Sequence, residues 1–241
     1  MSFSHFFTGS VRFLIGVKSV TVLFFGMAQS QAATTELKVK PQANGLPGIE
    51  IAIGYTLGTH EGGASRVSGS AFVDFENAAL SSAEFRVPIA AMTTGNEKRD
   101  CHMREALGLD YGLSGYPEAH VCDSSNRLPE SGVNAIQFPE VVFELTGLKA
   151  ADGTPLTRVD AGSEAQVLAI GAWTIHGVRK EQFIALRVVR ASGTASPELR
   201  VRGSFEILLK DFGVEVISWG GLIKVRDRAK VTLDLNLAEL R

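Results

Sequence analysis

The chain has 241 residues, a formal net charge of −2 at pH 7 and a hydrophobic fraction of 45%. A mildly acidic chain without a block of basic residues lacks the electrostatic footprint of a nucleic-acid-binding protein. The apolar fraction is ample for a core, and beyond the N-terminal segment no apolar run is long enough to span a membrane.

The first 32 residues have the pattern of a secretory signal peptide. Arg12 and Lys18 precede or interrupt a short apolar run that peaks at residues 20–28, and small residues follow at 28–33. A basic start, a short apolar centre and small residues at the end are typical of such a peptide. The run is shorter than the roughly 20 residues of a spanning helix, and an uncleaved anchor is the alternative.

Export would leave residues 33–241 in the periplasm or outside the cell. Removal of two basic residues and no acidic ones changes the formal charge from −2 to −4. The remaining length fits one β-rich domain or two small ones.

Beyond residue 45, apolar and polar residues alternate with the period of two that is typical of half-buried antiparallel strands. In residues 200–210, Val201, Phe205 and Ile207 fall on one face and charged residues on the other. The pattern predicts about eight strands, without the long helices of a doubly wound fold. One apolar face must be covered by a second sheet or by closure into a barrel, and the alternation alone leaves both open.

The strand pattern is interrupted at residues 94–107, which read TGNEKRDCHMREAL. Thr94 and Glu97 have the spacing of a capping box, which predicts the start of a short helix, and Gly108 predicts its end. A long excursion follows to about residue 133, and segments of this length are usually functional lids or stapled loops.

Cys101 and Cys122 are the only cysteines, and they bracket this loop. In an oxidising compartment we expect them to pair, closing a loop of about 22 residues and contributing about 3 kcal/mol. A zinc site with His102 and His120 is the rival, but the spacing is not the usual one and neighbouring helical residues diverge by about 100°. A nucleophilic cysteine with either histidine as base would need a lowered thiol pKa, and no known triad spacing is present.

The other residues with a chemical character have simpler interpretations. Asp100 next to Arg99 predicts an exposed charge pair worth under about 1 kcal/mol. Residues 211–213 read DFG, but the other kinase motifs are missing, so Gly213 is predicted to form a turn. His176 with the following glycine also predicts a tight turn. The sequence therefore indicates a protein that is not an enzyme and has no metal or cofactor of its own.

Four segments, in order along the chain, resemble the YceI-like family. They are residues 66–75 (RVSGSAFVDF), 92–110 (MTTGNEKRDCHMREALGLD), 168–180 (LAIGAWTIHGVRK) and 205–214 (FEILLKDFGV) with the closing IKVRDRAKVTLDLNL. The family consists of exported, lipocalin-like barrels that bind polyisoprenoid lipids. The resemblance implies an all-β fold of eight antiparallel strands closed into an elongated barrel, with a short helix, a long stapled loop and an apolar tunnel.

The resemblance also implies a function, which is an isoprenoid carrier or sink whose cargo could be a quinone-type lipid. It allows transient contact with a membrane and gives no oligomeric state. We expect the apolar strand faces to supply the ligand-binding residues. These are Phe72, Phe85, Val87, Ile89, Phe143, Trp173, Val201, Phe205, Ile207 and Leu233.

Two alternatives remain open. In the first, the protein is a structural or stress-linked exported barrel without lipid cargo, because its bulky aromatic side chains fill the interior. In the second, Asp100, His102 and His120 form the site of an exported metal-dependent hydrolase. We expect these residues to shape an entrance to the tunnel instead, because they lie outside the alternating strand faces.

Overall fold

The computed structural model describes residues 34–41, 48–64, 66–108, 138, 140–216, 218–219 and 223–239. The signal peptide predicted for residues 1–32 lies outside the described residues, as does nearly all of the predicted loop, including His120 and Cys122.

The described residues form twelve strands, one α-helix and three short 3-10 helices. The strands are β1 (Thr35–Val39), β2 (Ile49–Tyr55), β3 (Gly58–Ala64), β4 (Ser68–Val73), β5 (Ser82–Pro88), β6 (Met92–Thr93), β7 (Glu140–Ala150), β8 (Glu164–Ile175), β9 (Val178–Arg190), β10 (Glu198–Leu208), β11 (Ser218–Trp219) and β12 (Ile223–Ala238). The helices are α1 (Glu97–Ala106), η1 (Ala78–Leu80), η2 (Ile89–Ala91) and η3 (Leu209–Phe212).

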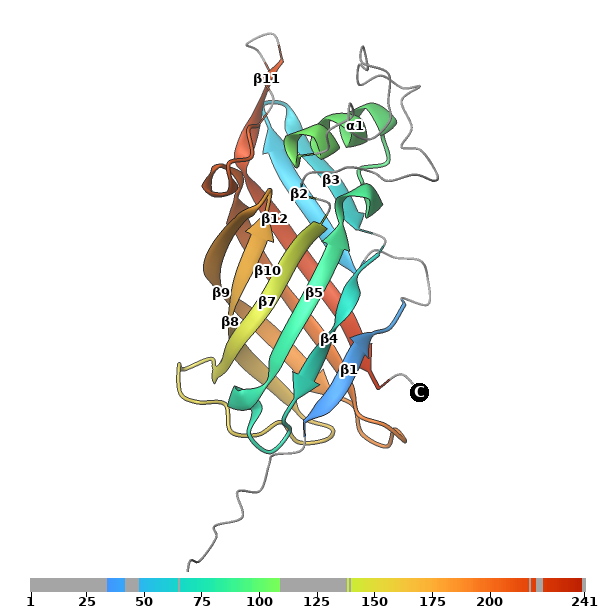
Figure 1. The fold of residues 1–241 in the computed structure, drawn as a ribbon, viewed down its shortest axis with the longest axis vertical. Helices are drawn as coiled ribbons and strands as arrows, with labels where there is room; N and C mark the ends of the chain where they lie inside the picture. The colour runs from blue at the N-terminus through green and yellow to red at the C-terminus, as the bar shows by residue number, and fades with distance from the viewer. Residues whose placement is uncertain are drawn as a thin grey trace, which may run out of the picture. The chain divides into compact units, whose positions relative to one another are not determined.

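Eight of the strands close into an antiparallel barrel (Figure 1). Their order around the wall is β1-β4-β5-β7-β8-β9-β10-β12, and β12 returns to β1, where Lys38 pairs with Ala238 and Val39 with Leu237. The predicted all-β barrel with one short helix is therefore confirmed, and the two-sheet alternative is excluded.

The long strand β12 has different partners along its two halves. Its first half pairs with β2, from Val225 opposite Tyr55 to Leu233 opposite Ile49, whereas its last residues pair with β1. From β2 the wall continues through β3 to β6, which follows β5 in the chain after η2. Next to α1 the wall is thus completed by β2, β3 and β6, and at the other end by β1 and β4 (Figure 1).

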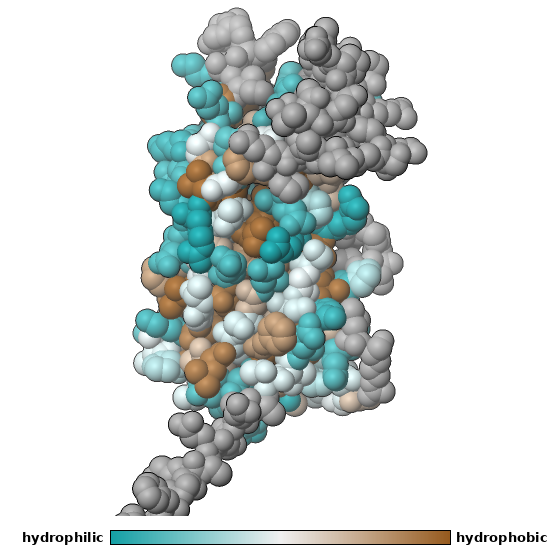
Figure 2. Space-filling model, viewed as in Figure 1, coloured by the Kyte–Doolittle hydropathy of each residue, from teal (hydrophilic) through white to brown (hydrophobic). Residues whose placement is uncertain are grey.

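The alternation in the sequence decides which side chains face inward. On β10, Phe205 and Ile207 are buried, whereas Ser204 before them and Glu206 between them are exposed. On the outer face of β10 and β12, Arg200 donates to the Asp234 carboxylate at 2.6 and 2.7 Å. Figure 2 shows polar and apolar side chains interleaved over the visible face of the barrel.

Two clusters of buried apolar side chains lie in the interior. The first, nearer α1, comprises Ala64, Val87, Met92, Val141, Phe143, Ala169, Trp173, Ile175, Ile184, Phe205, Ile207, Phe212, Val214 and Val231. The second lies toward β1 and comprises Leu37, Ala71, Val73, Phe75, Ala78, Ala83, Leu156, Val159, Val167, Val188, Leu199 and Leu237. Phe85, Leu145, Leu148 and Leu186 pack against both clusters, so they mark the level at which the clusters meet.

The start of α1 differs from the prediction. The N-cap residue is Asn96, whose side chain accepts a hydrogen bond from the backbone N–H of Arg99 at 3.0 Å, so Thr94 is not the cap. The helix stops at Ala106, and Gly108 beyond it has φ 98°, which agrees with the predicted glycine stop.

Both predicted turns are confirmed. His176 and Gly177 join β8 to β9 as a two-residue hairpin turn, with φ values of 51° and 74°, as a type I′ turn requires. The His176 ring packs edge-on against Phe138, with ring centroids 4.9 Å apart. Gly213 follows η3 in the left-handed conformation, at φ 68°.

Candidate functional site

A cavity of about 480 Å³ lies inside the end of the barrel next to α1. Its wall is mainly aliphatic and is supplied by strands on all sides of this end and by α1. The apolar residues that line it are Ile49, Ile51, Ile53, Val87, Met92, Met103, Ala106, Leu107, Val141, Trp173, Ile175, Ile207, Leu209, Val214, Val216, Val225, Ala229 and Val231. Such a wall favours an apolar ligand and offers it few hydrogen-bonding groups.

Polar side chains line the cavity on the side of α1. They are His60, Thr94, Asn96, Lys98, Arg99 and His102; Glu215, which follows η3, also lines the cavity. Arg99 holds this side together: its guanidinium donates to the backbone carbonyl of Thr94 at 3.2 Å and lies 3.3 Å from Nδ1 of His60. These groups could contact the polar end of a ligand whose apolar part lies deeper.

His60 is held in a defined position at this polar side. Its ring stacks on that of Tyr55, with ring centroids 4.1 Å apart. Burial, and then the positive charge of Arg99, lower the pKa of His60 below its ordinary value. The imidazole is therefore neutral at pH 7 and adds no positive charge beside Arg99.

At its deep end the cavity meets a group of three aromatic rings. Trp173 lines the cavity, and its ring centroid lies 4.7 Å from that of Phe143 and 5.5 Å from that of Phe205. All three side chains are buried. We call Phe143, Trp173 and Phe205 the aromatic floor.

A model of the YceI-like domain family matches residues 49–237 of the sequence. The chain belongs to the YceI-like family. The match begins at β2 and ends within β12, so it includes every strand that contributes to the cavity wall. No curated protein sequence matches the chain.

Solved structures share this YceI-like fold at low sequence identity. A polyisoprenoid binding domain from Saccharophagus degradans has a TM-score of 0.54 and 13% identity, over 87% of this chain and 100% of that one. Burkholderia cenocepacia BcnA has a TM-score of 0.52 and 16% identity, over 78% of this chain and 94% of that one. The Campylobacter jejuni YceI protein has a TM-score of 0.52 and 16% identity, over 76% of this chain and 86% of that one. At such identities the similarity concerns the fold alone.

Most of the predicted ligand-binding residues of this YceI-like barrel point inward, but only three line the cavity. These are Val87, Trp173 and Ile207. Phe143 and Phe205 are buried in the aromatic floor, and Ile89 is fully buried in η2. Phe85, Val201 and Leu233 are partly buried and pack against the core clusters.

The prediction for Phe72 is wrong. Its side chain is 45% exposed, and the inward positions on β4 are Ala71 and Val73. Phe72 pairs with Glu36 on β1 and Ser82 on β5, which are both exposed on the outer face. Because β4 carries apolar residues on both faces, its alternation does not identify the inner one.

The largest contribution to the wall that sequence reasoning missed comes from β2. Ile49, Ile51 and Ile53 alternate with Glu50 and Ala52, which is a period-two signal as regular as that of β10. Ala229 on β12 also lines the cavity, and its small side chain leaves room there.

The prediction of an exposed charge pair between Asp100 and Arg99 is wrong. Asp100 is only 5% exposed, and its carboxylate accepts hydrogen bonds from Thr93 Oγ1 and the Thr94 backbone N–H, both at 2.7 Å. A buried carboxylate needs such donors, and the start of a helix also favours its charge. Arg99 binds Thr94 and His60 instead.

No group of three or more potential metal ligands occurs among the described residues. His102 lies 3.2 Å from Glu105 on the same helix, and Cys101 is buried in α1. The zinc, hydrolase and disulfide hypotheses each need His120 or Cys122, which lie outside the described residues, so the disulfide stays a prediction. None of the described helices is long and apolar enough to cross a membrane.

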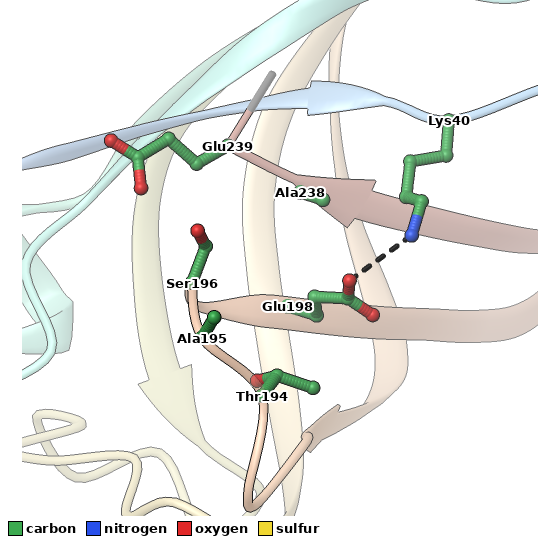
Figure 3. Close-up of a pocket in the computed structure, with 7 residues that line it drawn as sticks. All are labelled: Lys40, Thr194, Ala195, Ser196, Glu198, Ala238 and Glu239. Atoms are coloured by element: carbon green, nitrogen blue, oxygen red, sulfur yellow. Dashed lines mark hydrogen bonds and ion pairs between the residues drawn. The ribbon is translucent and has the colours of Figure 1, made fainter. Parts of the chain in front are cut away.

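A second pocket, of about 460 Å³, lies near the other end of β12 (Figure 3). It is lined by Lys40, Thr194, Ala195, Ser196, Glu198, Ala238 and Glu239. Its lysine is paired with Glu198 at 3.0 Å, and its other lining residues are small or acidic. The aliphatic cavity next to α1 is therefore the stronger candidate site.

Proposed function

We propose that this protein is an exported lipid-binding protein that holds the chain of a polyisoprenoid in the cavity next to α1. It would act as a carrier or a sink, and a quinone-type lipid is one candidate cargo. Delivery would involve transient contact with a membrane. Residues 1–32 would direct export and be removed.

The observation that carries the proposal is the aliphatic cavity inside a YceI-like barrel. Burial of apolar surface contributes about 25 cal/mol per Å², so an isoprenoid chain can bind such a cavity tightly without any reacting group. The similar structure from Saccharophagus degradans is described as a polyisoprenoid binding domain, which supports the same ligand class here.

A structural barrel without lipid cargo is the second candidate. The observation that favours it is the filled half of the interior, where the second cluster packs from Leu37 to Leu237. This filling does not extend to the α1 end, where the cavity remains.

Organic extraction of purified protein followed by mass spectrometry tests the proposal. We expect an isoprenoid lipid at close to one molecule per protein when the chain is produced with its leader in an exporting host. The Ala229→Phe variant should lose this lipid, because the new ring enters the cavity. The matched control is Phe183→Ala, which changes a side chain that is 63% exposed on β9. A folded wild-type protein that neither retains nor takes up any isoprenoid would favour the structural role.

A further inference from the structure

The aromatic floor separates the cavity from the filled half of the barrel. Its residues come from three strands: Phe143 from β7, Trp173 from β8 and Phe205 from β10. Of the three, Trp173 lines the cavity, whereas both phenylalanines lie behind it, 8% and 9% exposed. The cavity therefore ends at the indole ring.

A glycine fixes the position of this floor. Phe143 pairs with Trp173 across β7 and β8, and its ring lies over Gly171, the next inward position on β8. A Cβ at residue 171 would clash with Cζ and Cε2 of that ring. An aromatic ring placed over a glycine on a neighbouring strand is a known device for stabilising sheets. Here the missing side chain at Gly171 leaves room for the Phe143 ring to lie across the interior.

The volume above the floor limits how much chain can be enclosed. A cavity of about 150 Å³ accommodates benzene, which corresponds to about 25 Å³ per carbon atom. On this scale a cavity of about 480 Å³ holds about 19 carbon atoms, or roughly four isoprene units.

We propose that the aromatic floor sets the length of prenyl chain that the barrel encloses, at about four isoprene units. Phe143, Trp173 and Phe205 are then determinants of chain-length specificity, and a longer chain leaves its remaining units outside the cavity. This inference rests on the proposed function, because it assumes that the ligand is an isoprenoid.

Competition among prenols of different length tests the inference. An equimolar mixture of farnesol, geranylgeraniol and solanesol, with three, four and nine isoprene units, is incubated with full-length protein, and the bound prenols are quantified by mass spectrometry. We expect geranylgeraniol to bind at least about tenfold more tightly than farnesol, since it buries one more apolar unit. Solanesol should bind within about threefold of geranylgeraniol, because its further units find no cavity.

Two floor variants shift this profile in a defined direction. Phe205→Ala and the milder Phe143→Leu both remove part of the floor, so each should raise the affinity for solanesol relative to geranylgeraniol by at least about fivefold. Phe72→Ala is the matched control, because it removes an aromatic side chain from the outer face of β4 and should leave the profile unchanged.

The outcomes separate this inference from the proposed function. If the wild-type protein binds solanesol more than tenfold more tightly than it binds geranylgeraniol, the floor does not limit the enclosed chain length. This result would overturn the inference even if neither floor variant folded. An unchanged profile in a floor variant with wild-type circular dichroism would overturn it as well. Failure of all three prenols to bind would instead overturn the proposed function, and the inference with it.

Discussion

Asp100 anchors α1 to the strand that precedes it. It is buried, and it ties the helix to Thr93 and Thr94 at the end of β6. Since Arg99 and His102 line the cavity from the same helix, this carboxylate also positions the polar side of the cavity.

We expect Asp100→Ala to lower the free energy of unfolding by about 1–3 kcal/mol, because it leaves buried donors without an acceptor. Urea unfolding at neutral pH measures this difference. Asp211→Asn, at an exposed carboxylate on η3, is the control and should change stability by under about 0.5 kcal/mol. Equal stability of the two variants would contradict the anchoring role.

His60 gives a pH dependence whose sign follows from its lowered pKa. Its unfolded-state pKa is about 6.5 and its folded-state pKa is lower, so between these values the unfolded chain binds more protons. The contribution of His60 to stability is therefore complete above about pH 6.5 and decreases as the pH falls through this window. Solvent screening keeps the effect small, because the side chain is partly exposed.

Urea unfolding at about pH 7.5 and about pH 5 should show a smaller loss of stability in His60→Gln than in the wild-type protein. His102→Gln, at the other histidine that lines the cavity, serves as the comparison. A steeper loss of stability in His60→Gln than in the wild type would contradict a lowered pKa of His60 in the folded protein.

At the scale of elements, the alternation predicted strands well wherever a strand has one clean apolar face. β10 is such a strand, and Phe205 and Ile207 point inward as expected. β4 is not, because Ala71, Phe72 and Val73 are consecutive apolar residues, and register with β1 and β5 decides which face is buried.

The cavity itself could not be predicted from local patterns. Whether aromatic side chains fill a barrel or leave space depends on the glycines near them on neighbouring strands, as with the Phe143 ring, which lies over Gly171. The helix at residues 97–106 was predictable, but its cap was not. Thr94 has the right spacing for a capping box, yet it instead donates to Asp100, and Asn96 is the cap.

The disulfide between Cys101 and Cys122 remains a prediction at the scale of elements. It would fasten the long loop to α1, and reduction should lower the free energy of unfolding by about 3 kcal/mol if the loop contains about 22 residues. Urea unfolding with and without dithiothreitol measures this. A variant with both cysteines replaced by serine should not respond to the reductant, and two free thiols in the unreduced wild-type protein would rule the bond out.

At the scale of the whole molecule, barrel closure depends on β1, whereas the cavity depends on β2. β1 closes the wall at one end through β4 and β12, whereas β2 takes the corresponding place beside β12 at the end with the cavity. Leu37 on β1 is fully buried in the second cluster, and no residue of β1 lines the cavity. Stability and ligand binding should therefore be separable by mutation.

Leu37→Ala should lower the free energy of unfolding by about 2–5 kcal/mol, because it leaves a space in the second cluster that neighbouring strands can fill only in part. Geranylgeraniol affinity should stay within about twofold of the wild type, since the cavity wall is unchanged. Ala229→Phe should behave in the opposite way: its ring occupies existing space, so it should lose ligand binding with a stability change under about 1.5 kcal/mol. Urea unfolding and prenol binding, measured on both variants, test the separation. Loss of binding in a folded Leu37→Ala protein would show instead that the two halves of the barrel act as one unit.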